Sequence, residues 1–152
     1  MSNLNDLKQY NSKLGRLKRC ESKLREHKLK LENYDKLKAA TLSDMPTHRD
    51  DSECNSIVER SLMSRQDLEK EVLMLELEIA ELNSFIVNVD SLLDCVDYRS
   101  KWILEAIYKT GLYDKRHKEL LHKKYVDDVK IVSYRHFKDI VSEAHRKYNR
   151  IK

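Results

Sequence analysis

Residues 68–96, LEKEVLMLELEIAELNSFIVNVDSLLDCV, carry the most regular pattern in this chain. Apolar residues recur there at alternating steps of four and three, with no Pro or Gly between them. The series is Leu68, Val72, Leu75, Ile79, Leu82, Ile86, Val89, Leu93 and Val96. This spacing, kept over four heptads, predicts a long helix that packs its apolar side against another helix.

The residues beside this apolar series are acidic at Glu69, Glu71, Glu76 and Glu78. Parallel pairing of two copies would place like charges together, at a cost of only a few tenths of a kcal/mol per contact. Burial of one Leu or Ile contributes about 1.5–3 kcal/mol, so repulsion disfavours self-pairing without preventing it. A basic partner helix removes the penalty. Further along, Phe85 and Leu92 replace charged residues, and with Val89 they predict an interface with a second subunit or another partner.

A basic helix is expected over residues 4–39. Its apolar residues recur at steps of three, four and seven, and its polar face carries Lys13, Arg16, Lys18, Arg19, Lys23 and Arg25. This helix is either an ordinary solvated amphipathic helix or the electrostatic complement of the acidic one. Residues 41–56 contain the single Pro and no periodicity, which predicts a loop that lets the two helices fold back antiparallel.

Composition favours an all-α protein. The 152 residues include two Gly, one Pro and 37% charged side chains. No apolar run approaches the roughly 20 residues of a membrane span. The start of the sequence lacks the apolar segment of a signal peptide. The three cysteines are widely spaced without a CxxC motif, as expected for reduced thiols. These features together predict a cytoplasmic protein without a membrane partner.

Charge is unevenly distributed along the chain. Residues 1–40 have 11 basic and 5 acidic side chains, and residues 41–60 have 2 and 5. Residues 61–98 have 2 basic and 9 acidic side chains, whereas residues 99–152 have 15 and 7. An acidic middle between two basic ends suggests internal pairing of the first two parts and a polyanionic partner for the last.

The C-terminal part is predicted to contain three short helices. Asp97 is suited to cap the first, and Gly111 to end it in a left-handed conformation. The second is expected over residues 114–124, with Leu120 and Leu121 buried, and residues 126–132 form a connector with some strand propensity. Ser133 is suited to cap the last helix, which extends to about Arg150. Its inner face would comprise Phe137, Ile140, Val141, Ala144, Tyr148 and Ile151.

No arrangement of residues indicates catalysis or metal binding. The six histidines are scattered, and His117 and His122 are five residues apart rather than four. With only Gly15 and Gly111 available, neither a GxGxxG fingerprint nor a P-loop is present. We therefore expect a protein that is not an enzyme and needs no cofactor or metal.

Short helices in a basic segment suit a helix-turn-helix module that contacts double-stranded DNA. On the last helix, Tyr134, Arg135, His136 and Lys138 would face base edges in the major groove. Ser142, His145 and Arg146 follow on its outward side. Phosphate contacts are predicted for Lys115, Arg116, Lys123, Lys124, Lys130, Lys147 and Arg150. The alternative is that these charges only keep the surface soluble.

The order of features resembles small phage-encoded transcriptional regulators of Gram-positive bacteria, related to late-gene activators. The resemblance rests on LKAAT at 37–41, IVER at 57–60, IVNVDSLL at 86–93 and DYR at 97–99, followed by an apolar helix and a basic final helix. It implies an N-terminal helical hairpin split by a polar loop and a C-terminal helix-turn-helix like sigma-factor region 4.

The expected fold is therefore all-α, with a long antiparallel helical hairpin (coiled coil) over residues 1–96 and a helix-turn-helix-like module over residues 97–152. The expected function is that of a phage-type DNA-binding transcriptional regulator that dimerises through the hairpin, in the cytoplasm of a bacterial host. The first alternative is a helical phage protein that binds and modulates a host protein, such as polymerase or a defence nuclease. A purely structural coiled-coil rod is the second.

Overall fold

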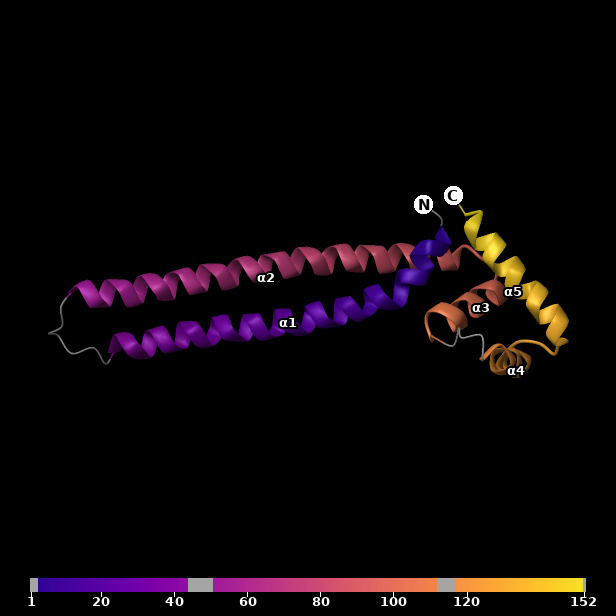
Figure 1. Cartoon of the computed structure of the whole chain (residues 1–152), viewed down its shortest axis with the longest axis horizontal. Coiled ribbons are helices and arrows are strands. Elements are labelled where there is room, and N and C mark those ends of the chain that lie inside the picture. The colour runs from indigo at the N-terminus through magenta and orange to yellow at the C-terminus, as the bar shows by residue number, and fades with distance from the viewer. Residues whose placement is uncertain (1–2, 44–50, 112–116, 152) are drawn as a thin grey trace. The chain divides into compact units, whose positions relative to one another are not determined.

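The computed structural model describes the backbone of residues 3–43, 51–111 and 117–151, and the side chains of residues 3–36, 64–111 and 117–151. Over these ranges the chain is all-α, as expected from its composition, and forms no strand. The helices are α1 (Asn3–Ser43), α2 (Asp51–Asp94), α3 (Tyr98–Tyr108), α4 (Lys118–Asp128) and α5 (Tyr134–Asn149) (Figure 1).

The chain divides into two compact units, and both long helices contribute to each. Unit 1 comprises residues 1–16 and 82–152, and unit 2 comprises residues 17–81. The boundary expected at residues 96 and 97 lies inside unit 1. The reason is that the start of α1 and the end of α2 share one apolar core with the three short helices.

The core of unit 1 forms because each helix contributes one apolar side. Leu7 of α1 and Leu93 of α2 are fully buried together with side chains of α3, α4 and α5. The ring of Trp102 packs edge-on against that of Tyr125, with 5.4 Å between centroids. The predicted inner face of α5 is confirmed, with Phe137, Ala144 and Tyr148 buried and its other members partly buried. Burial of the Tyr148 hydroxyl raises the pKa of this residue to about 12.

In unit 2, segments of α1 and α2 run antiparallel and are linked by opposite charges. Lys28 Nζ lies 2.7 Å from Glu76 Oε1, and Asp35 Oδ1 lies 2.9 Å from Arg65 Nη1. His27 Nε2 lies 2.6 Å from Glu71 Oε2. Because the lower-numbered residues of α1 pair with the higher-numbered residues of α2, the directions are opposite. Two of these pairs join His27 and Lys28 of α1 to acidic residues of α2, and the third joins an acidic residue of α1 to a basic residue of α2.

The loop expected at 41–56 is shorter at both ends than predicted. Residues 41–43 still belong to α1, and α2 begins at Asp51 rather than near residue 57. Nothing before Pro46 breaks the first helix, while Asp51 and Glu53 are acidic residues that favour a helix N-terminus. Residues 44–50 lie outside the described part of the chain. At its other end α2 stops at Asp94.

The second short helix ends later in the sequence than expected. It continues to Asp128 instead of ending near Lys124, so residues 126–128 are helical and not part of a connector. Burial of Tyr125 holds this last turn, and the packing outweighs the strand preference of Val126. Leu121 is buried as expected, but Leu120 is 54% exposed, which corrects that prediction. The expected start at Asp114 lies outside the described residues.

Three predicted helix ends are confirmed. Asp97 accepts a hydrogen bond from Ser100 N at 3.3 Å and caps α3. Ser133 Oγ accepts one from His136 N at 3.3 Å and caps α5. Gly111 follows α3 with φ of 69°, the left-handed conformation that glycine adopts without strain.

Candidate nucleic-acid interface

The start of α5 presents cations to solvent. Ser133 fixes the first turn, and Arg135, His136 and Lys138 follow it with exposed side chains. None of the three forms an ion pair within the described part of the chain. The Nζ of Lys138 lies 4.6 Å from the centroid of the Tyr134 ring. A helix N-terminus carries a partial positive charge, so it adds to the field of these side chains.

The remaining residues predicted to contact DNA are placed differently from one another. Lys130 and Arg146 are exposed, and the exposed Ser142 donates its hydroxyl to the carbonyl of Lys138 at 3.1 Å. Tyr134 is half-buried, because its ring packs against that of His122 with 5.4 Å between centroids. Lys115 and Arg116 lie outside the described residues.

Three other lysines of unit 1, Lys101, Lys109 and Lys147, are neutralised by carboxylates. Lys147, expected to meet a phosphate, instead lies 2.9 Å from Asp97 Oδ1 and 3.2 Å from Glu143 Oε1. Its hydrogen bond is the main reason that the pKa of Asp97 falls to about 2, and hydrogen bonds from Ser100 add to the effect. The start of α5 and the exposed Lys118, Lys123 and Lys124 of α4 are among the positions of unit 1 whose positive charges form no ion pair in the described residues.

A second neutralised lysine joins three helices inside unit 1. Lys109 Nζ lies 2.8 Å from Asp90 Oδ1 and 3.1 Å from Glu105 Oε1, and its ammonium sits 5.2 Å from the centroid of the Tyr10 ring. Burial acts to lower the pKa of Lys109, but the two carboxylates outweigh it and raise the value. This cluster is structural, and it leaves no charge for an anionic partner.

Two histidines have roles that the sequence did not reveal. His122 Nε2 donates to the carbonyl of Val132 at 2.8 Å, so it ties α4 to the segment before α5. His145, expected to point outward, is half-buried and bonded on both ring nitrogens. The contacts of His122 with Val132 and of His145 with Tyr108 join different segments of the chain, which no local pattern signals. Within the described residues, no group of three His, Cys, Asp or Glu is placed to bind a metal.

The residues predicted to form a dimer interface lie in or beside the core of unit 1. Val89 is fully buried within the chain, so it offers no surface to a second subunit and we remove it from the predicted interface. Leu92 is partly buried against the core. The Phe85 ring is covered by Lys13, whose Nζ lies 4.1 Å from its centroid.

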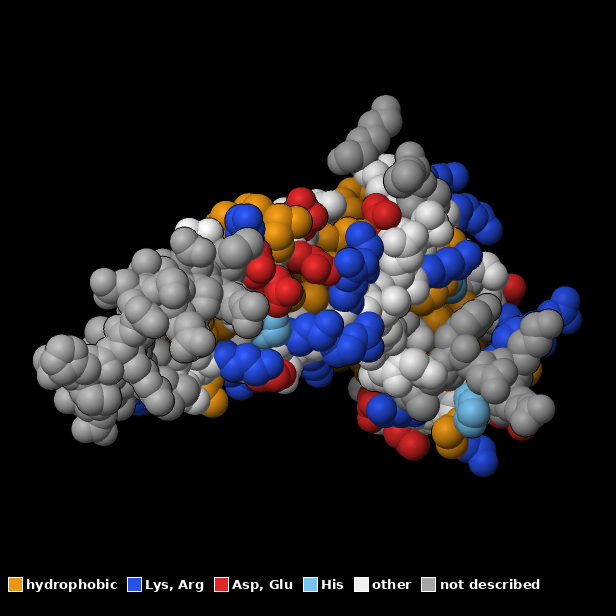
Figure 2. Space-filling model, turned by 60° about the vertical axis from the view of Figure 1, so that its left-hand side comes forward, with side chains coloured by type: hydrophobic (Ala, Val, Ile, Leu, Met, Phe, Trp, Pro, Cys, Tyr) orange, Lys and Arg blue, Asp and Glu red, His pale blue; other side chains and the backbone are white. Residues whose placement is uncertain are grey.

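Exposed apolar side chains occur instead on α2 in unit 2. Leu73, Met74 and Leu77 are between 56% and 66% exposed. Figure 2 shows hydrophobic side chains at the surface of the long helices next to acidic ones. A cluster of this kind, rimmed by charge, is typical of a protein-binding surface.

Comparison with known proteins finds no match: no family model, no curated protein and no solved structure corresponds to this chain. None of the helices, over the residues that the structure describes, combines the length and the apolar character needed to cross a bilayer.

Proposed function

We propose that the chain is a DNA-binding transcriptional regulator of the phage type, acting in the cytoplasm of a bacterial host. The observation that carries the proposal is the pair of exposed cations at the start of α5, Arg135 and Lys138, with the exposed His136 between them. Lys101, Lys109 and Lys147 of the same unit are neutralised by carboxylates, whereas these side chains form no ion pair within the described residues. Exposed positive side chains without an internal partner can form ion pairs with a polyanion.

In this proposal α4 and α5 act as a helix-turn-helix-like pair. The start of α5 enters the major groove, where Arg135 can bind a guanine edge with two hydrogen bonds and contribute about 1–3 kcal/mol of discrimination. Lys123, Lys124 and Lys130 then meet phosphates and set the position on the duplex. The packing of α5 on α3 through its buried side supports this assignment, because it leaves the cationic side open.

The helical hairpin formed by α1 and α2 would join two chains, so that two copies of α5 bind two half-sites. The exposed side chains of Leu73, Met74 and Leu77 support a pairing surface in unit 2 rather than the one first expected near Phe85 and Leu92. Each such side chain, once covered, contributes up to about 1.5–3 kcal/mol.

The test is fluorescence anisotropy of the full chain with random and phage-promoter duplexes at two salt concentrations. We expect an affinity that falls steeply with salt, because phosphate contacts release counterions. The double substitution Arg135→Gln/Lys138→Gln removes two cations of α5 and should weaken binding by about tenfold or more. Lys23→Gln/Lys36→Gln removes the same charge from exposed positions of α1 and should change affinity less than about twofold. The proposal would be contradicted by an affinity that does not change with salt concentration, or by equal losses of duplex affinity in the two variants.

A second candidate function is binding of a host protein, such as polymerase or a defence nuclease, through the same exposed residues of α2. Light scattering separates it from the first candidate. A dimer that becomes monomeric on Leu73→Glu/Leu77→Glu supports pairing of two copies. The second candidate is supported by three results together. The chain is a monomer, it does not bind the duplex, and it binds a specific host protein from lysate only while Leu73 and Leu77 are present.

A further inference from the structure

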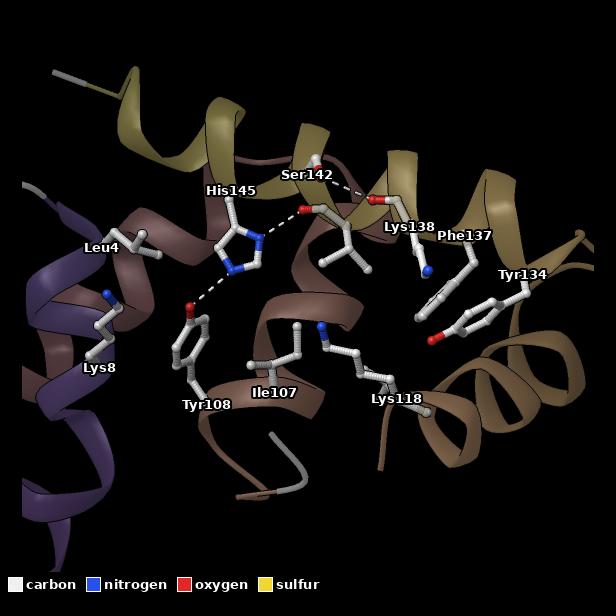
Figure 3. A pocket seen from close by; sticks show the side chains of 12 residues that line it. Leu4, Lys8, Ile107, Tyr108, Lys118, Tyr134, Phe137, Lys138, Ser142 and His145 are labelled. Carbon is white, nitrogen blue, oxygen red and sulfur yellow. Dashed lines mark hydrogen bonds between the residues drawn. The ribbon is translucent and has the colours of Figure 1, made fainter. Parts of the chain in front are cut away.

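A cavity of about 630 Å³ opens within unit 1, between the start of α1 and the helices α3, α4 and α5 (Figure 3). Its volume is within the usual range of small-molecule sites, about 300–1,000 Å³. Its lining combines two kinds of surface, an apolar floor and a cationic rim.

The floor is made of side chains from the core of unit 1. Ile107 of α3, Leu121 of α4 and Phe137 of α5 line the cavity, and each is at least 96% buried. Val141 adds a partly buried aliphatic surface beside them. Such a floor favours a flat apolar group, because the hydrocarbon face of that group leaves water when it lies on the floor.

The rim carries three ammonium groups from three different helices. Lys8 of α1, Lys118 of α4 and Lys138 of α5 line the cavity with exposed side chains (Figure 3). No carboxylate is among the lining residues, and none of the three lysines forms an ion pair in the described ranges. This differs from Lys109 and Lys147 of the same unit, which each contact two carboxylates. The rim is therefore positive and not neutralised from within.

The polar groups at the cavity wall are held in fixed orientations. His145 Nδ1 lies 2.7 Å from the carbonyl of Val141, and since a carbonyl can only accept, Nδ1 carries a proton. In the neutral ring Nε2 is then the acceptor, so the Tyr108 hydroxyl, 2.9 Å away, donates to it.

We infer that this cavity binds a small anion with a planar aromatic body. The body lies on Ile107, Leu121 and Phe137, and the anionic group lies among Lys8, Lys118 and Lys138. Phosphate, sulfonate and carboxylate groups all satisfy this chemistry, since each accepts hydrogen bonds from ammonium groups. The site shares Lys138 with the proposed DNA contact, whereas Arg135 of that contact does not line the cavity.

The test uses a matched pair of fluorescent probes with the full chain: anilinonaphthalene sulfonate, and phenylnaphthylamine, which has the aromatic body without the charge. We expect saturable binding of one sulfonate dye per chain, at least about tenfold tighter than that of the neutral dye. Lys118→Gln/Lys138→Gln should abolish this preference. The control Lys123→Gln/Lys124→Gln removes two exposed charges of α4 outside the cavity and should preserve it.

A second variant separates the cavity from the open surface. Ser142→Phe places a ring at the cavity wall while all three lysines remain, so it should prevent dye binding without changing the melting temperature. The inference is overturned if the sulfonate dye does not saturate, or if the two lysine pairs behave alike. It is also overturned if Ser142→Phe leaves dye binding unchanged. Arg135→Gln should weaken duplex binding and spare dye binding, so failure of the DNA proposal and failure of this one remain distinguishable.

Discussion

Asp97 combines two contacts in one side chain. Its carboxylate caps α3 through Ser100 and accepts a hydrogen bond from Lys147 of α5 at 2.9 Å. These bonds favour the charged form, which is why the pKa of Asp97 falls to about 2. One residue therefore joins the start of one helix to the side of another.

The pH dependence of stability follows from this shift. Because the pKa of Asp97 is lower in the folded than in the unfolded chain, its ionised form stabilises the fold above about pH 4. That contribution is lost as the pH falls toward 2. Since the side chain is 45% exposed, we discount it for solvent screening to about 0.5–1 kcal/mol. Asp97→Asn keeps a capping residue but loses the ion pair. In urea unfolding followed by circular dichroism, we expect the variant to be less stable near neutral pH and the difference to vanish near pH 2. A difference that grows on acidification would contradict this account.

Local residue chemistry was predictable from the sequence, and the cavity was not. Asp97, Ser133 and Gly111 act on neighbours within three residues, so residue type and position sufficed. Lys8 and Lys118 approach one cavity although 110 positions separate them, and nothing in the sequence marks them as partners. Arg135 and Lys138 were predictable as exposed, since the apolar spacing of the last helix places them outside.

Among the elements, α4 was the least well predicted. Leu120 and Leu121 are adjacent and chemically identical, so the sequence suggested that both were buried. Adjacent helical residues point about 100° apart, and only one of them can face the core. The strongly amphipathic α5 presented no such ambiguity, and its inner face was predicted correctly.

This pair provides an internally controlled test of packing. Leu121→Ala removes a side chain that is 4% exposed and should lower the free energy of unfolding by about 2–4 kcal/mol. Leu120→Ala changes a side chain that is 54% exposed and should cost less than about 1 kcal/mol. Chemical denaturation of the two variants measures both values. Similar losses would mean that α4 is rotated from the orientation described.

On the scale of the whole molecule, the two units differ in how much core they contain. Unit 1 has thirteen buried residues in one cluster, including side chains from all five helices. In unit 2 only Leu17 and Cys20 are buried among the residues whose side chains are described. Its ion pairs between helices are exposed, and such pairs contribute about 0–1 kcal/mol each.

We therefore expect unit 2 to open before unit 1. Amide hydrogen exchange followed by mass spectrometry should show peptides from residues 64–80 of α2 exchanging at least about tenfold faster than those of α3 and α5. Peptides from the last two turns of α2 should be protected like α3, because Val89 and Leu93 belong to the core of unit 1. Uniform protection along α2 would contradict the division into units.

The boundary between the units is only weakly marked in the sequence. The heptad series continues without interruption from Leu75 through Leu82 to Val89, and the single sign of a change near residue 82 is the absence of charged residues between Glu81 and Asp90. The all-α class followed from composition. Which parts of the two long helices share a core with the C-terminal helices depends on contacts between residues far apart in sequence.

The packing of Trp102 against Tyr125 gives the protein a built-in optical reporter. This is the single tryptophan of the chain, and it lies in unit 1. Fluorescence emission excited selectively at the indole ring will therefore report changes in unit 1 and not in unit 2. An emission change on adding a small aromatic anion, with no change in overall helicity, locates the event without any label.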